Sequence, residues 1–162
     1  MIRPESKGDV AAVRRVLIET FPSGVEAKLV DDLRAAGDLV LSLVADHGGI
    51  LGHVAFSRLR FAATGLSGVA LGPIGVLPEQ QRRGLGYALV REGLALLTEA
   101  GEDLVVVLGE PAFYERFGFS RAAATRIETP YDGPYLLAKA LNEQGSRAQG
   151  EVRYAPAFAA LG

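Results

Sequence analysis

The sequence predicts an α/β fold (mixed α+β) in which one mixed β-sheet carries helices on both faces. Two observations predict it. The apolar segments 39–45 and 50–59 flank the turn sequence 46–49 (Asp-His-Gly-Gly), which is typical of an antiparallel hairpin. Further along, a strand-like segment, a long helical segment and a second strand-like segment follow one another, an order typical of parallel pairing. Together the two patterns predict a mixed sheet that contains both antiparallel and parallel strand pairs.

Length and composition restrict the class of protein. The 162 residues suit one domain, 1–162, and the 49% of hydrophobic residues exclude a disordered chain. The absence of Cys excludes disulfides, thiolate metal sites and thiol nucleophiles, and only His47 and His53 remain as imidazole ligands, so we expect no metal. A net charge of −2 argues against a nucleic-acid partner.

No segment predicts a membrane partner or a targeting signal. The longest uncharged stretch, 61–77, is interrupted by several Gly and a Pro, and Met1–Glu5 lacks the apolar core of a signal peptide. We therefore expect a cytoplasmic protein.

Two helices are predicted in the N-terminal part. The sequence 23–26 (Ser-Gly-Val-Glu) reads as a capping box that opens the second helix, which Gly37 would end. We expect its inner face to carry Val25, Leu29 and Leu33. Apolar residues at helical spacing after Asp9 define the first helix: Val10, Val13, Leu17 and Phe21.

The remaining elements follow from apolar patterns and from the glycines that end them. Residues 104–108 (Leu-Val-Val-Val-Leu) have the continuous apolar character of a strand buried on both faces. The other expected elements are a strand over 68–76, a long helix over 84–100, a short helix over 112–117 and closing strands over 135–141 and 152–158.

The start of the long helix has features that a bound phosphate would explain. Its first turn lacks the usual Ser, Thr, Asp or Asn cap, and Arg82 and Arg83 lie at the positive end of the helix dipole. Gly84 and Gly86 remove side chains at the same place. A phosphate would accept hydrogen bonds from the free amides and pair with the arginines.

The preceding strand is also unusual, because Gly72, Pro73 and Gly75 interrupt an apolar stretch. Such a strand should bulge or leave backbone groups unpaired. The phosphopantetheine arm of coenzyme A has two amides and leads directly to a pyrophosphate. The amides would suit the unpaired groups of the strand, and the pyrophosphate would suit the start of the helix that follows it. The dinucleotide Gly-x-Gly-x-x-Gly pattern, the nucleoside-triphosphate loop and the Gly-x-Ser-x-Gly elbow are all absent.

These residues resemble the GNAT superfamily of N-acetyltransferases. The resemblance lies in 74–78 (Ile-Gly-Val-Leu-Pro), 81–86 (Gln-Arg-Arg-Gly-Leu-Gly), the strand 104–108 and 113–119 (Phe-Tyr-Glu-Arg-Phe-Gly-Phe). The sequence 108–111 (Leu-Gly-Glu-Pro) is similar to a bacterial subgroup of predicted acetyltransferases. The resemblance implies a single GNAT-type domain whose mostly antiparallel sheet has six to seven strands and is splayed between strands 4 and 5.

By this resemblance, acetyl-CoA lies in the splayed gap as cosubstrate. Backbone groups near Ile74, Gly75 and Val76 would bind the pantetheine and polarise the thioester carbonyl, as an oxyanion site does. The residues implied to hold the pyrophosphate at the helix start are Gln81, Arg82, Arg83, Gly84, Leu85, Gly86 and Tyr87.

Tyr114 matches the family tyrosine that protonates the departing thiolate, and an ordinary phenol keeps its proton at neutral pH. The alternative is that Tyr114 only anchors a short helix. Glu79 is the tentative general base, and Glu110 is an alternative because it follows the next strand. We expect His53 to be a satisfied, half-buried residue, and a water relay or an already neutral amine would need no base at all.

The sequence therefore predicts an N-acetyltransferase that moves an acetyl group from acetyl-CoA to a primary amine by direct attack on the thioester. The alternative is a non-catalytic acyl-CoA-binding or sensing domain. The acceptor would be a small-molecule or peptide amine. The last strand is expected to be an edge strand that Pro156 protects, although Tyr154 or Phe158 would suit an acceptor pocket or the contact of a homodimer.

Overall fold

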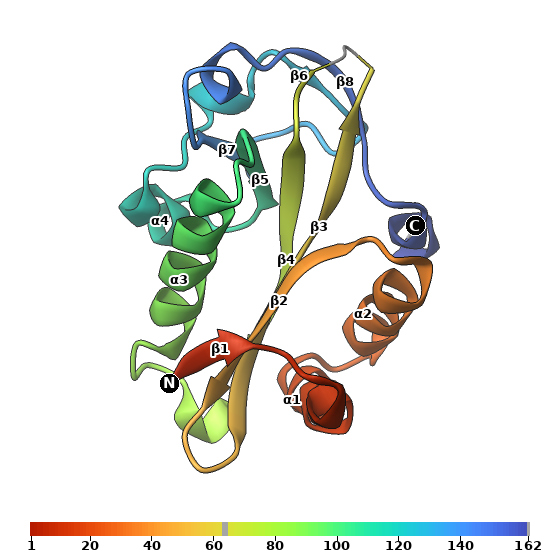
Figure 1. Cartoon of the computed structure of the whole chain (residues 1–162), viewed down its shortest axis with the longest axis vertical. Coiled ribbons are helices and arrows are strands. Elements are labelled where there is room, and N and C mark those ends of the chain that lie inside the picture. The colour runs from red at the N-terminus through yellow and green to blue at the C-terminus, as the bar shows by residue number, and fades with distance from the viewer. Residues whose placement is uncertain (63–64, 162) are drawn as a thin grey trace.

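The fold is organised around a twisted sheet, which the computed structural model describes within residues 1–62 and 65–161 (Figure 1). The strands follow the order β1-β2-β3-β4-β5-β7, and β8 pairs with the far end of β3 and with β6. Pairing is antiparallel except at β4–β5 and β6–β8. The strands are β1 Ile2–Pro4, β2 Leu39–Asp46, β3 Ile50–Phe61, β4 Gly68–Val76, β5 Leu104–Leu108, β6 Ile127–Glu128, β7 Leu136–Ala140 and β8 Gly150–Arg153.

The predicted mixed sheet is confirmed, with eight strands among the described residues instead of six or seven. The two additional strands, β1 and β6, have three and two residues, which is too short to show a period in the sequence.

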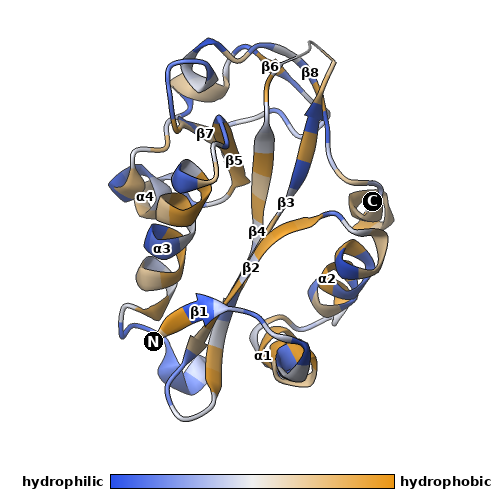
Figure 2. Cartoon of the chain, viewed as in Figure 1, coloured by the Kyte–Doolittle hydropathy of each residue, from blue (hydrophilic) through white to orange (hydrophobic). Residues whose placement is uncertain are grey.

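Helices cover both faces of the sheet, as predicted (Figure 1). On one face, α1 and α2 bury Val13, Leu17 and Val30 against β2 and β3. On the other, Leu89 and Val90 of α3 pack against the apolar side chains of β4 and β5. Figure 2 colours the ribbon of the chain by the hydropathy of each residue. The helices are α1 Val10–Thr20, α2 Val25–Ala36, α3 Leu85–Glu99 and α4 Pro111–Tyr114, joined by short 3₁₀ turns that include η2 Pro78–Gln80, η3 Glu115–Phe117 and η6 Pro156–Leu161. No helix in the described part of the chain is both long and hydrophobic enough to span a bilayer.

The predicted capping box at the start of α2 is wrong. Gly24 occupies the N-cap position with a φ of 72°, and the hydroxyl of Ser23 accepts a 3.3 Å hydrogen bond from the amide of Val25. The helix therefore begins one residue later than a Ser23 cap would require. Val25, which was expected on the inner face, is 41% exposed at the first position of the helix, whereas Leu29 and Leu33 are buried as predicted.

The predicted closing strand over 152–158 is also wrong in its second half. β8 ends at Arg153, and the chain continues into η6, which begins at Pro156. Because proline has no amide hydrogen, it cannot continue the strand ladder. Phe158 packs instead against Leu29 and Leu33 of α2.

The predicted bulge in β4 is present. Val54 of β3 pairs with Ile74 and Phe56 pairs with Leu71, so Gly72 and Pro73 together lie opposite a single residue of β3. On its other edge, β4 pairs with β5 only from Gly68 to Leu71. Beyond Leu71 the two strands separate, which is the expected splay.

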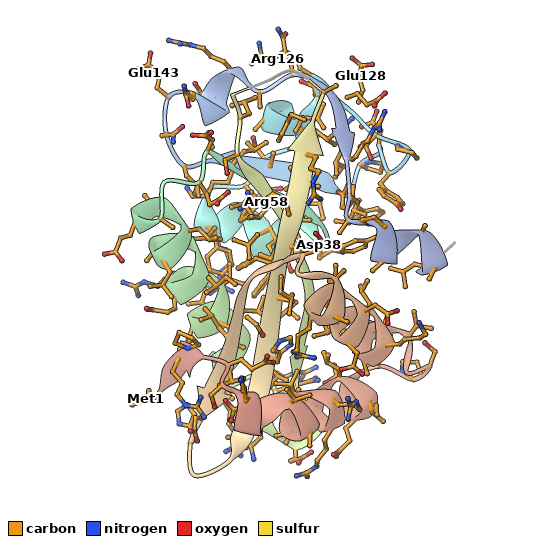
Figure 3. All side chains as sticks on the ribbon, turned by 45° about the vertical axis from the view of Figure 1, so that its right-hand side comes forward. Met1, Asp38, Arg58, Arg126, Glu128 and Glu143 are labelled. Carbon is orange, nitrogen blue, oxygen red and sulfur yellow. The ribbon has the colours of Figure 1, made fainter. Side chains whose placement is uncertain are left out.

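A partly buried polar cluster joins the starts of these two strands. The guanidinium of Arg58, labelled in Figure 3, donates to both carboxylate oxygens of Glu102 at 2.7 and 2.9 Å and to the hydroxyl of Ser67 at 2.9 Å. Burial favours a higher pKa for Glu102, but the hydrogen bonds from Arg58 and Ser67 outweigh it and lower the pKa. The amide of Ser67 also donates to the carboxylate of Asp103. The cluster thus fastens β4 to β5 at the end opposite to the splay.

Gly93 lets α3 approach the sheet closely. A Cβ built on Gly93 would lie 2.5 Å from Cζ of Phe56, whose side chain is fully buried. We expect Gly93→Ala to lower the free energy of unfolding by about 1–3 kcal/mol through overpacking, although alanine is the better helix former. Denaturant unfolding measures this. Glu92→Ala, at the exposed neighbouring position, should change stability by less than about 0.5 kcal/mol, and an equally stable Gly93→Ala variant would contradict the prediction.

Candidate active site

Two adjoining cavities lie where β4 separates from β5. The first, which we call the loop cavity, has a volume of about 400 Å³ and lies at the start of α3, between Arg82, Gly84 and Arg116. The second, the cleft cavity, has about 390 Å³ and lies between β4, the end of α1 and α4. Val76, Gln81, Gly86 and Phe113 line both cavities, so the two lie directly beside each other.

The backbone of the loop cavity presents unused donors. Arg82 and Gly84 both have left-handed conformations, with φ of 66° and 83°. None of the amides from Arg82 to Tyr87 donates a hydrogen bond to a described residue, and no side chain caps α3. Successive amides in alternating conformations at a helix start form a concave anion site. A Cβ at Gly84 would meet only open space, so an anion can approach this backbone.

Two arginines, Arg82 and Arg116, line the loop cavity, and a third, Arg83, lies beside it. Arg82 and Arg83 are exposed at the start of α3, and Arg116 of η3 reaches over the ring of Tyr87, with its Cζ 4.8 Å from the ring centroid. None of the three forms an ion pair with a described carboxylate, although Arg83 contacts Gln80 at 3.4 Å. Their charges therefore remain available to an anion in the cavity.

The cleft cavity exposes one edge of β4. Ile74 and Gly75 pair with β3, but the edge that would face β5 has no strand partner among the described residues. The carbonyl of Val76 accepts hydrogen bonds from Thr20 at 3.1 Å and from the side chain of Gln81 at 3.0 Å. These contacts hold the end of β4 against α1 and the loop, which leaves the free edge in a fixed position.

Tyr114 lies in the same cavity, held by aromatic neighbours. Its ring packs edge to face on Phe113 at 4.9 Å and on Phe119 at 5.7 Å, and the residue is 6% exposed. A Cβ at Gly109 would overlap this ring, so the glycine is what allows the tyrosine to lie across the end of β5. Burial raises the pKa of Tyr114 to about 12. Its hydroxyl therefore stays protonated and makes no hydrogen bond to a described residue.

Of the side chains considered as the general base, one lines the cleft cavity and the others do not. Glu110 lines the cleft cavity together with Tyr114, whereas Glu79 is exposed on η2 and lines neither cavity. His53 is completely buried rather than half-buried, with its Nε2 2.8 Å from the hydroxyl of Ser42. Burial, with a smaller contribution from the charge of Arg34, lowers its pKa to about 3, and it lies outside both cavities.

Most residues that the sequence singled out meet in these cavities. Ile74, Gly75 and Val76 line the cleft cavity, while Arg83 does not line either one. The predicted loop residues that line one or both cavities are Gln81, Arg82, Gly84, Leu85, Gly86 and Tyr87.

Sequence reasoning missed several residues of the cavities: Thr20, Phe21, Gly109, Phe113 and Arg116. Gly109, Phe113 and Arg116 lie in motifs that the sequence had already marked, so their closeness to Tyr114 was a usable signal. Thr20 and Phe21 had no such signal, because only tertiary packing brings the end of α1 to β4.

A parallel β4–β5 pair that separates beside an uncapped, arginine-rich helix start defines the acetyltransferase class of the GNAT fold. A family model described as "Acetyltransferase (GNAT) domain" matches residues 38–121. The chain belongs to this family of acetyl-CoA-dependent N-acetyltransferases.

Particular relatives support this assignment. The chain is 44% identical over 135 residues to the uncharacterized N-acetyltransferase YhbS of Escherichia coli K12, covering 82% of this chain and 81% of that protein. It is 34% identical to the uncharacterized N-acetyltransferase YjhQ of the same strain, covering 81% and 74%.

Two crystal structures are similar over nearly the whole chain. The E. coli YhbS structure in complex with CoA gives a TM-score of 0.92 at 37% identity, covering 100% of this chain and 93% of the other. A GNAT acetyltransferase from Brucella melitensis in complex with acetyl-CoA gives 0.83 at 37% identity, covering 98% and 97%.

The left-handed conformation of Arg82 should cost stability. A non-glycine residue in this region is disfavoured by about 1 kcal/mol or more, so we expect Arg82→Gly to raise the free energy of unfolding of the ligand-free protein by about 0.5–1 kcal/mol. Arg83→Gly is the matched control. Arg83 has an ordinary negative φ, and glycine there should leave stability unchanged or lower it by up to about 1 kcal/mol. Equal effects of both substitutions in denaturant unfolding would show that Arg82 is not strained.

Proposed function

We propose that residues 1–162 form one domain that transfers the acetyl group of acetyl-CoA to a primary amine by direct attack on the thioester. The observation that carries this proposal is that the two cavities adjoin. A row of free amides at the start of α3 lies in the loop cavity, and the unpaired edge of β4 and Tyr114 lie in the neighbouring cleft cavity. The CoA and acetyl-CoA complexes of the two 37% identical relatives support it.

The chain's own groups fit the parts of this cosubstrate in order. The amides of Arg82 to Tyr87 would hold the pyrophosphate, with charge supplied by Arg82, Arg83 and Arg116. The free edge of β4 from Ile74 to Val76 would pair with the amides of the pantetheine arm, in place of a neighbouring strand. This arrangement brings the thioester to the side of the cleft cavity that holds Tyr114.

The chemistry then needs a fixed donor, an acid and a route for one proton. A backbone amide of β4 stabilises the negative charge that develops on the carbonyl oxygen as the amine nitrogen attacks. The C–N bond forms, the C–S bond breaks, and Tyr114 gives its proton to the departing thiolate. Because the amine starts as an ammonium ion, its nitrogen loses two protons. One restores the phenol of Tyr114 and the other is released, so the products are the N-acetylamine, coenzyme A and one proton.

The proton from the amine needs an acceptor near the cleft. Glu79 is the carboxylate that follows β4, but its exposed position on η2 requires a water relay to reach the cleft cavity. Glu110 lines that cavity with Tyr114, and this favours Glu110 over Glu79 for the role. Transfer to water from an amine that is already neutral would require neither residue.

The proposal is tested by incubating the protein with acetyl-CoA and a panel of primary amines. We expect thiol release together with N-acetylated amine, detected by mass spectrometry. Gly84→Glu should abolish both turnover and acetyl-CoA binding, since it adds a negative charge where the pyrophosphate would lie. Gly101→Glu is the matched control, because Gly101 has nearly the same φ (85° against 83°) but lies beyond the other end of α3.

Two results would contradict the proposal. If Gly84→Glu bound acetyl-CoA with unchanged affinity in calorimetric titration, this loop would not be the binding site of the pyrophosphate. Tight binding of acetyl-CoA without turnover of any amine would favour the non-catalytic acyl-CoA-binding alternative.

Tyr114→Phe should lower kcat by about 10²-fold or more and leave acetyl-CoA affinity unchanged, since only the acid is lost. Gly109→Ala should lower kcat as well, because the methyl group displaces the ring of Tyr114. Steady-state kinetics and calorimetry measure both. Tyr135→Phe is the control, as Tyr135 is 57% exposed and lies outside the cavities. Full activity of Tyr114→Phe would exclude this residue as the acid.

A further inference from the structure

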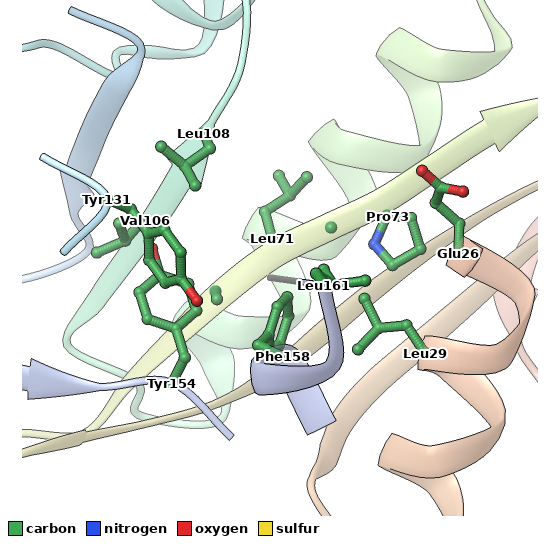
Figure 4. A pocket seen from close by; sticks show the side chains of 12 residues that line it. Glu26, Leu29, Leu71, Pro73, Val106, Leu108, Tyr131, Tyr154, Phe158 and Leu161 are labelled. Carbon is green, nitrogen blue, oxygen red and sulfur yellow. The ribbon is translucent and has the colours of Figure 1, made fainter. Parts of the chain in front are cut away.

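A third hollow, which we call the aromatic pocket, lies across the sheet from α3. It has a volume of about 220 Å³ and is enclosed by β4, β5, α2 and η6 (Figure 4). Pro73 and Leu108 line it, whereas the next residues along the same strands, Ile74 and Gly109, line the cleft cavity. Because successive side chains of a strand point to opposite faces of the sheet, the aromatic pocket and the cleft cavity lie on opposite sides of the gap between the separating strands.

The walls of this pocket are almost entirely apolar. Tyr131, Tyr154 and Phe158 form a chain of edge-to-face contacts, with ring centroids 4.8 and 5.3 Å apart. The described residues that line the pocket include no Lys, Arg or His. Leu108 and Leu161 also line it although each is 46% exposed, so apolar surface extends from the pocket towards solvent. A bound acid would find no cation to pair with.

Two polar atoms in the pocket have no partner. Oε1 of Glu26 and the hydroxyl of Tyr154 are shielded from solvent, and neither makes a hydrogen bond with a described residue. Leaving such a group unpaired is unfavourable. Figure 4 shows Glu26 beside Pro73 at one end of the pocket, and the two tyrosines at the other end. Burial raises the pKa of Tyr154, so its hydroxyl is uncharged, and Glu26 is the one charged residue of the lining.

We infer that the aromatic pocket binds the acceptor as a small primary amine on an uncharged apolar group, with the ammonium paired to Glu26 and the apolar group against Tyr131, Tyr154 and Phe158. The inference rests on the proposed acetyltransferase activity. The carboxylate lies at the Pro73 end, next to the residues that would hold the thioester, so the nitrogen is the part of the acceptor that faces the acetyl group. The pocket is smaller than the ~300–1,000 Å³ typical of drug-sized ligand sites, which limits the acceptor to a small molecule.

The selectivity follows from the cost of burying a charge without a partner. A second ammonium or a carboxylate at the far end of the acceptor would have to enter the aromatic end of the pocket. Three amines of equal chain length isolate this effect: n-hexylamine, 1,6-diaminohexane and 6-aminohexanoate. With saturating acetyl-CoA, we expect kcat/KM for n-hexylamine to exceed both others by at least about tenfold.

Substitutions locate the effect in the pocket. Glu26→Gln should raise KM for n-hexylamine about tenfold and leave acetyl-CoA affinity unchanged, because the charge partner of the ammonium is lost. Glu26→Asp should recover part of the loss. Phe158→Ala should reduce the preference for n-hexylamine over 6-aminohexanoate. Glu92→Gln, on the exposed face of α3, is the matched control and should leave all constants unchanged.

Stability must be measured beside the kinetics, because Glu26 lies in the first turn of α2 and Phe158 packs against that helix. Thermal unfolding shows whether each variant is folded at the assay temperature. If a variant is unfolded at that temperature, the wild-type protein is titrated with the three amines in the presence of coenzyme A. The inference then depends on whether n-hexylamine binds more tightly than 1,6-diaminohexane and 6-aminohexanoate.

The outcomes separate this inference from the proposed function. Equal kcat/KM for the three amines, or unchanged kinetics in folded Glu26→Gln, would overturn the assignment of the pocket while acetyl transfer stands. If the wild-type protein did not bind acetyl-CoA at all, the proposed function itself would be refuted. A preference for n-hexylamine that persists in Glu26→Gln at a raised KM, and that shrinks in Phe158→Ala, supports the inference.

Discussion

The pairing of β4 with β5 over only four residues governs where every cavity of the site lies. Arg58, Glu102 and Ser67 hold the two strands together at their starts, and the bulge at Gly72 and Pro73 ends regular pairing beyond Leu71. A sheet that closed fully there would satisfy its backbone internally. Because it does not, β4 keeps an unpaired edge that an extended ligand with amides of its own can occupy.

Charged groups of opposite sign lie on the two sides of this gap. On the α3 side, the loop cavity combines free amides with Arg82 and Arg116, and among the described residues no carboxylate forms an ion pair with either arginine. Across the sheet, Glu26 is the one charged side chain among the described residues that line the aromatic pocket. In the proposed function, an anionic cosubstrate and a cationic acceptor would thus be attracted to opposite sides of the same opening.

Local patterns were sufficient for most of the fold. The hairpin of β2 and β3, the buried strand β5 and the helix α3 each have a period or a run of apolar residues that holds over many positions. The failures occurred where a single residue decides the outcome. Gly24 rather than Ser23 caps α2, and Pro156 turns the expected end of β8 into a 3₁₀ turn. Such points depend on local backbone geometry, which the pattern of hydropathy does not encode.

The sequence by itself determined the cofactor side of the site, because its residues are contiguous: the strand 68–76, the turn and the start of α3 place their own backbone groups in order. Tyr114 was marked in the same way by its motif. Only the tertiary structure decided that Arg116 enters the loop cavity, that Gly109 makes room for Tyr114, and that Glu26 faces an apolar pocket. Arg116 and Glu26 come from segments that are distant in the chain from the start of α3 and from β4, and tertiary packing brings them together. Gly109 and Tyr114 are neighbours in sequence, but only the structure shows that the tyrosine ring lies against the glycine.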